Sequence, residues 1–296
     1  MFRGLLGLVV FAAFAPSSAL AATPGTWVPA GHLLSPPKEA YVVNVTTGKD
    51  GLIYAVGSTQ YTGKLAAQTY NPATRKSTYI ATPPGGGCVV TGAAGKIWVI
   101  NTAMTSAYSP TKSAWSSYAV MPSSIIGGGG PCVTGADGMI YVIDTWRGTT
   151  VYRYDPNANS WTALSATAPA NGYEGVAVLG PDQNLYVIGN NGPYACTIRM
   201  DLYHPTTNSW TTGATPSVCA ASTATIGPDG RLYAGWAGTN TGVFMGAYSF
   251  VTSSWSTLPA SPNAGSLATA AGALYSIGGH NLKYSGAGTS VFKFVP

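Results

Sequence analysis

The stretch from Gly135 to Leu164 contains the unit that the rest of the chain repeats. It begins with the turn Gly135-Ala136-Asp137-Gly138, continues into Met139-Ile140-Tyr141-Val142-Ile143, and later reads Val151-Tyr152-Arg153-Tyr154-Asp155-Pro156 and Asn159-Ser160-Trp161-Thr162. Asp-Gly supplies the positive-φ positions of a tight hairpin, and the β-branched and aromatic runs on either side are typical of strands. We therefore predict one strand, a turn and three more strands for this unit.

The apolar-aromatic pair of this unit occurs six times, at Ile53-Tyr54, Ile97-Trp98, Ile140-Tyr141, Leu185-Tyr186, Leu232-Tyr233 and Leu274-Tyr275. Successive aromatic positions are 44, 43, 45, 47 and 42 residues apart, a regularity that indicates a repeat architecture. A second landmark is an aromatic residue followed seven positions later by Trp, at Tyr108/Trp115, Tyr154/Trp161, Tyr203/Trp210 and Tyr248/Trp255. In the first copy Ser77 takes the place of the Trp.

These second landmarks resemble the outer strands of the kelch repeat, which carry Tyr-Asp-Pro-x-x-Asn-x-Trp. Residues 154–161 match that pattern fully, and residues 203–210 match it with His204 in place of Asp. The resemblance covers nearly all of the chain after residue 21, although the double glycine of the repeat is kept only at Gly278-Gly279. It implies four-stranded blades around a central channel.

The two ends of the chain complete one another. The sixth copy ends at Val291–Pro296, where its Trp strand should begin, whereas Gly25-Thr26-Trp27-Val28 is a Trp strand with no copy before it. We predict that the N-terminal strand pairs with the C-terminal blade, which removes exposed edges between the first and last blades. The predicted fold class is all-β, a six-bladed β-propeller of four-stranded antiparallel blades forming one domain over residues 22–296.

Residues 1–21 have the features of a signal peptide. Arg3 precedes a short apolar run over Leu5–Phe14, and Ala19 and Ala21 fit a small-x-small cleavage site. No later run is long enough to span a bilayer. The sequence therefore predicts a secreted protein, extracellular or periplasmic, without a transmembrane segment.

Composition excludes two further classes of protein. Only 8% of the residues are charged, against about 25% in an average globular chain, and the chain carries 8 Trp and 18 Tyr, which excludes a disordered chain. No cluster of Lys and Arg occurs, so a nucleic-acid partner is not expected.

The propeller topology sorts residues onto two faces. We call the face that carries the connections between second and third strands and between blades the loop face, and the opposite one the turn face. The turn face carries the Asp-Gly and Asn-Pro turns, so five acidic residues are predicted to form turns rather than to act in catalysis. They are Asp50, Asp137, Asp155, Asp182 and Asp229.

All four cysteines are predicted on the loop face. Four cysteines allow three pairings, and we favour Cys196 with Cys219 because both lie on neighbouring loops of one blade. Cys88 then pairs with Cys132, a less secure assignment because innermost strands of adjacent blades can hold their Cα atoms more than about 7 Å apart. Metal binding by the thiols is the weaker alternative, since no Cys-x-x-Cys spacing occurs.

The loops of the loop face carry aromatic side chains together with a few charged ones. The candidate ligand-binding residues are Tyr61, Trp146, Arg147, Tyr173, Glu174, Tyr194, Trp236, His280, Lys283 and Tyr284. This mixture suits the apolar face of a sugar or a partner protein. The alternative is that the rings only cap the channel.

Glu174 is the carboxylate with a catalytic alternative. It directly precedes a predicted innermost strand, and a periplasmic kelch-type sialic-acid mutarotase uses Glu and Arg at a comparable place, so the resemblance allows a sugar isomerase. An ordinary salt bridge is the competing explanation. Secreted kelch-type propellers also include copper-radical oxidases, but His204 lies on the wrong face and only His32 and His280 share a blade, so we predict no metal and no cofactor.

We therefore expect a secreted propeller whose function is non-catalytic binding of a glycan or of an extracellular protein. A sugar-modifying enzyme is the second hypothesis. The third is a structural subunit of an extracellular assembly, because low charge density favours self-association.

Overall fold

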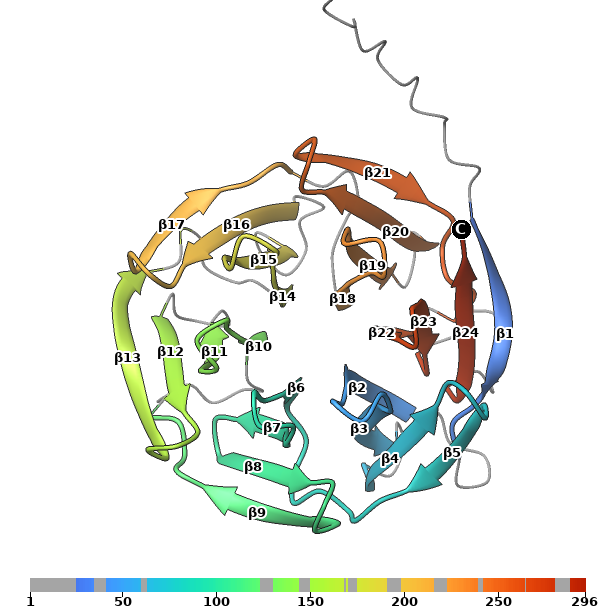
Figure 1. The fold of residues 1–296 in the computed structure, drawn as a ribbon, viewed down its shortest axis with the longest axis horizontal. Helices are drawn as coiled ribbons and strands as arrows, with labels where there is room; N and C mark the ends of the chain where they lie inside the picture. The colour runs from blue at the N-terminus through green and yellow to red at the C-terminus, as the bar shows by residue number, and fades with distance from the viewer. Residues whose placement is uncertain are drawn as a thin grey trace, which may run out of the picture.

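A computed structural model describes residues 25–34, 41–59, 63–122, 130–143, 150–167, 169, 175–190, 198–215, 223–238, 242–263, 265–279 and 288–296. Within these ranges twenty-four β-strands form six four-stranded antiparallel sheets. The sheets are arranged as blades around a central axis (Figure 1). The predicted six-bladed propeller is therefore confirmed, while the predicted signal peptide lies outside the described residues.

Each blade is an up-and-down meander that starts at the channel. The first blade consists of β2 (Tyr41–Thr47), β3 (Ile53–Thr59), β4 (Leu65–Asn71) and β5 (Lys76–Tyr79). The second consists of β6 (Cys88–Thr91), β7 (Ile97–Asn101), β8 (Met104–Ser109) and β9 (Ala114–Tyr118). The third consists of β10 (Cys132–Thr134), β11 (Ile140–Ile143), β12 (Thr150–Asp155) and β13 (Ser160–Thr167).

The other half of the ring follows the same plan. The fourth blade consists of β14 (Gly175–Leu179), β15 (Leu185–Asn190), β16 (Ile198–His204) and β17 (Ser209–Thr212). The fifth consists of β18 (Thr223–Ile226), β19 (Leu232–Gly238), β20 (Gly242–Ser249) and β21 (Ser254–Leu258). The closing blade consists of β22 (Ser266–Ala270), β23 (Ala273–Ile277), β24 (Ser290–Val295) and β1 (Thr26–His32).

The closing blade joins the two ends of the chain. Its strand order is β1-β24-β23-β22, and Trp27 lies opposite Phe294 in an antiparallel register. The two rings are in contact, with centroids 5.2 Å apart. Figure 1 shows β1 outside β24 at the rim of the ring. The predicted closure by the N-terminal strand is thus confirmed.

The turn face is built from a repeated contact between a tyrosine and an aspartate. Tyr141 donates its hydroxyl to Asp137 Oδ2 at 2.7 Å, while Oδ1 of the same carboxylate accepts the backbone N–H of Met139. The equivalent tyrosine-to-aspartate bonds are Tyr54–Asp50, Tyr186–Asp182 and Tyr233–Asp229, at 2.6 to 2.9 Å. The predicted role of these aspartates as turn residues is confirmed, and Asp155 accepts the N–H groups of Asn157 and Ala158 in the other kind of turn.

In the second blade both partners of this contact are replaced, whereas the closing blade keeps Tyr275 and has Ala271 in place of the aspartate. Trp98 takes the place of the tyrosine, and Ala94 takes the place of the aspartate. An indole has no hydroxyl to donate to a carboxylate. The ammonium of Lys96 lies 6.0 Å from the centre of the Trp98 ring instead.

Neighbouring blades are joined through the outer tryptophans. Trp161 on β13 donates its indole N–H to the carbonyl of Ala119, which follows β9 of the preceding blade, at 2.8 Å. The same bond occurs for Trp115 to Ala81, Trp255 to Ala214 and Trp27 to Pro259. Ser77 keeps this link although it replaces Trp, because its hydroxyl donates to the carbonyl of His32 at 2.9 Å. The core lies between blades, as where Trp98 and Ile100 pack against Ile140 and Tyr154.

Deleting residues 22–34 is expected to lower the free energy of unfolding by about 3 kcal/mol or more, the order measured for removal of a large buried aromatic side chain. The deletion removes β1 and Trp27 and leaves the edge of β24 unpaired. Chemical denaturation measures the loss, and deletion of residues 22–24 alone is the control. Equal stability of the two truncated proteins would contradict the closing role of β1.

Raising the pH is expected to destabilise the protein above about pH 10. Burial raises the pKa of Tyr70, Tyr203 and Tyr233 to about 12, whereas an unfolded tyrosine has a pKa of about 10. Since folding favours the neutral phenol, this contribution is complete below about pH 10 and is lost as the pH rises through about 12. Urea midpoints should fall in that window, and less steeply for Tyr203→Phe; a parent midpoint independent of pH there would refute the argument.

Candidate functional site

The innermost strands enclose a cavity that opens on the loop face. Its volume is about 450 Å³, and it is lined by residues from β2, β6, β10, β14, β18 and β22. These strands follow one another around the axis in that order (Figure 1). The lining lies in the first halves of the strands, before the turn face is reached. This channel mouth is the candidate site.

The side-chain hydroxyl and amide groups of the channel mouth lie on one arc. On the arc formed by β18, β22 and β2 the lining includes Thr223, Ser266 and Asn44, together with the apolar Val45, Ala224 and Leu267. On the opposite arc, formed by β6, β10 and β14, it includes the disulfide-bonded Cys88 and Cys132 and then Val176 and Ala177. A ligand in the cavity would therefore meet side-chain hydroxyl and amide groups on one arc only, and apolar side chains all around the wall.

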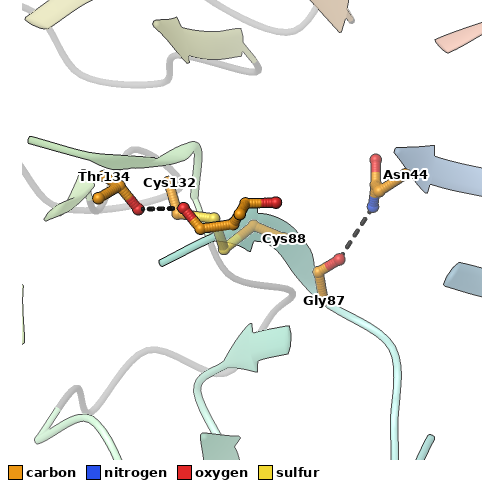
Figure 2. Close-up of a disulfide and its surroundings, with 6 residues drawn as sticks. Asn44, Gly87, Cys88, Cys132 and Thr134 are labelled. Atoms are coloured by element: carbon orange, nitrogen blue, oxygen red, sulfur yellow. Dashed lines mark hydrogen bonds between the residues drawn. A yellow bond between two sulfur atoms is a disulfide. The ribbon is translucent and has the colours of Figure 1, made fainter. Parts of the chain in front are cut away.

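Asn44 is the most exposed polar group of this wall. Its Nδ2 donates to the carbonyl of Gly87 at 2.9 Å (Figure 2), which orients the amide and leaves Oδ1 to accept from a ligand. On the same arc Thr223 Oγ1 accepts the backbone N–H of Leu267 at 2.6 Å, so its hydroxyl proton can be donated elsewhere. The two side chains thus offer an acceptor and a donor.

A disulfide joins the second and third blades at the channel mouth. Cys88 on β6 and Cys132 on β10 are bonded, with their Cα atoms 5.9 Å apart (Figure 2). This confirms the predicted pairing, and the separation falls within the usual range for disulfides. Cys196 and Cys219 lie outside the described residues, so their pairing stays a prediction. Disulfides are typical of oxidising compartments, which agrees with export.

Threonines bind the same strands together nearer the turn face. Thr134 donates to the carbonyl of Thr91 at 2.9 Å, and Thr91 donates to the carbonyl of Thr47 at 2.8 Å. Thr47 in turn donates to the carbonyl of Thr269 at 2.8 Å. Four consecutive innermost strands, β10, β6, β2 and β22, are therefore connected by side-chain hydrogen bonds. These hydrogen bonds hold the strands that form the wall of the channel mouth.

The loop-face residues predicted from the sequence are not described. Tyr61, Trp146, Arg147, Tyr173, Glu174, Tyr194, His280, Lys283 and Tyr284 lie outside the described residues. The backbone of Trp236 lies on β19 opposite Phe244, but its side chain is likewise outside the description. Their roles stay predictions.

His204 belongs to the turn face, as predicted. Its Nδ1 lies 2.7 Å from Asn184 Oδ1 and its Nε2 lies 2.7 Å from Thr211 Oγ1. In the described ranges, no three His, Cys, Asp or Glu residues lie close enough together to hold a metal ion. That part of the chain also contains no helix with the length and apolar character needed to cross a membrane.

Reasoning from the sequence missed Asn44 and Thr223 as parts of the site. An isolated asparagine or threonine on a predicted strand carries no signal of its own. The repeat did contain a signal for these site residues. Asn44, Cys88 and Thr223 each lie four residues before the glycine that opens a turn, at Gly48, Gly92 and Gly227.

Comparisons with known proteins establish likeness at the level of the fold. Searches of protein families and of curated proteins found no match. Among solved structures, a Bacteroides thetaiotaomicron protein of unknown function matches with a TM-score of 0.68 and 12% identity, covering 92% of this chain and 76% of the other. A Dyadobacter fermentans protein of unknown function matches with a TM-score of 0.64 and 11% identity, covering 92% and 98%.

A fungal alcohol oxidase of the AA5 family, in complex with copper, matches with a TM-score of 0.60 and 17% identity, covering 92% of this chain and 76% of the oxidase. At such identities the match supports the propeller and carries no activity across. The resemblance to kelch repeats stays a prediction.

Replacing Cys88 and Cys132 with Ser is expected to lower the free energy of unfolding by about 4 kcal/mol in the chain-entropy description, because the bond spans a sequence separation of 44 residues. Denaturant titration of the double variant measures this change. Mass mapping of the unreduced parent should yield a linked peptide pair containing both residues. Recovery of Cys88 as an alkylated thiol without prior reduction would contradict the assignment.

Proposed function

We propose that this protein is a secreted, non-catalytic binding protein that takes a neutral sugar into the channel mouth. The observation that carries the proposal is the distribution of side chains in the cavity, with Asn44, Thr223 and Ser266 grouped on one arc and apolar side chains, among them the disulfide and Val176, over the rest of the wall. A sugar ring has hydroxyl groups along its edge and apolar C–H groups on its faces. The polar arc and the apolar side chains suit these two sides.

The size and rigidity of the site support the same proposal. A volume of about 450 Å³ lies within the range of small-molecule sites, about 300 to 1,000 Å³. The disulfide and the threonine bonds hold four of the six wall strands in place. A wall that is already ordered loses little conformational entropy when a ligand binds.

Asn44→Ala and Thr223→Val are each expected to weaken sugar binding about fivefold, since each removes one hydrogen bond worth about 1 kcal/mol. A glycan array on the purified mature chain identifies the sugar, and calorimetric titration measures the affinity. Thr225→Val is the matched control, because it makes the same change on β18 at a residue that does not line the cavity.

Two outcomes would contradict sugar binding, and each leads to a different conclusion. Binding to no glycan on the array, or equal affinities for Asn44→Ala, Thr223→Val and the parent, would overturn the proposal. If an extracellular protein is captured instead and Asn44→Ala weakens that capture, the channel mouth is a protein interface.

The sugar-modifying enzyme is retained as a second candidate on one observation. Gly175, the residue that follows Glu174 in the sequence, lines the channel mouth. For an enzyme, Glu174→Gln is expected to abolish turnover and to leave sugar affinity largely unchanged. Parent and variant should be compared in a mutarotation assay, and absence of turnover in the parent would remove this candidate.

A further inference from the structure

A second hollow lies on the loop face, in the first blade. It is a groove of about 310 Å³ lined by Lys64, Leu65, Tyr79, Ile80 and Thr82. Leu65 begins β4 and Tyr79 ends β5, so both lie where the chain reaches the loop face. An aliphatic floor beside an aromatic ring and a few polar groups is typical of a small ligand site.

Tyr79 is an aromatic residue that the blade does not need. Its position lies two residues after the outer Trp position, and the corresponding residues of the next four blades are small, namely Ser117, Ala163, Thr212 and Thr257. Tyr79 is 47% exposed. Because four blades form with a small residue at this place, packing of the fold does not explain the ring. An exposed tyrosine presents an apolar face with a hydroxyl at its edge.

Gly86 separates this groove from the channel mouth. Gly87 lines the channel mouth, and Leu65, whose Cδ2 would lie 3.9 Å from a Cβ on Gly86, lines the groove. The carbonyl of Gly86 accepts a hydrogen bond from Asn101 Nδ2, which holds the segment in place. Gly86 is itself exposed.

Packing requires Gly87, whereas a side chain at Gly85 would meet only the flexible end of Met104, and Gly86 is not required by packing. A Cβ on Gly87 would collide with the carbonyl oxygen of Ile100, and one on Gly85 would lie 2.7 Å from Met104 Sδ. At Gly86 the nearest contact of 3.9 Å is an ordinary one, and this glycine is not among those with positive φ. Neither packing nor backbone conformation therefore explains the absence of a side chain at this exposed position.

We propose that the channel mouth and the groove are consecutive subsites for one linear neutral oligosaccharide, which crosses Gly86 and places a further sugar ring against Tyr79. This inference rests on the proposed function and extends it from a single sugar to a chain. Joining two weak subsites through one covalent ligand raises affinity, because the second contact forms within the same complex.

Calorimetric titration with gluco-, manno- and N-acetylglucosamine oligosaccharides, from monosaccharide to hexasaccharide, tests the proposal on the intact mature chain. For the parent we expect affinity to rise about tenfold or more with chain length. Gly86→Leu should abolish this gain and leave monosaccharide affinity unchanged, because it adds a side chain only between the two hollows. Tyr79→Ala should reduce the gain, and Val120→Ala, which shortens an exposed apolar residue of the second blade, should behave as the parent.

Thermal melts establish that each variant is folded, and Gly86→Ala replaces Gly86→Leu if the larger side chain prevents folding. Equal affinity for all chain lengths, with monosaccharide binding still sensitive to Asn44→Ala, would overturn the extension and leave the proposed function standing. A length-dependent gain that survives Gly86→Leu or its replacement would overturn the path over Gly86. Binding at no length would overturn both proposals.

Discussion

The structure depends on the pairing of β1 with β24. A ring of sheets is stable only if its first and last members meet, since otherwise two unpaired edges are left exposed. Here β1, a strand from the N-terminus, completes the C-terminal sheet, with Trp27 against Phe294. The first and closing blades also meet at their innermost strands, where Thr47 donates to the carbonyl of Thr269.

Because the six blades repeat one pattern, a residue that departs from the pattern in one blade can be compared with its equivalents in the others. The tyrosine-aspartate contact occurs in four turns, and in the second blade both partners change together, to Trp98 and Ala94. Such a paired change preserves the fold and needs no functional explanation. Tyr79 is a different kind of exception, because it is about half exposed and has no aromatic equivalent in the next four blades. Comparison among copies thus separates what the blade requires from what a ligand would require.

The sequence was sufficient to predict the fold because the fold is encoded in local and periodic signals. Each Asp-Gly turn fixes where two strands meet, and each outer Trp fixes where a blade ends, so six copies with one displaced strand lead to one topology. The composition of the site was not accessible in the same way. Asn44 and Thr223 lie on different blades, and their shared place four residues before a turn glycine is seen only when the copies are aligned with one another.

The cysteines illustrate the difference between what the sequence predicts and what only the structure shows. The sequence placed Cys88 and Cys132 on adjacent innermost strands, yet pairing required the distance between their Cα atoms, 5.9 Å, and that distance is set by how two blades pack. The resulting bond fixes part of the apolar arc of the channel mouth, while the threonines fix the strands beneath it. Rigid walls lower the entropy lost on binding, but they also prevent the site from closing around its ligand. A ligand that extends from such a site along the surface gains affinity from each further contact. Gly86, which has no side chain, lies between the channel mouth and the groove that contains Tyr79.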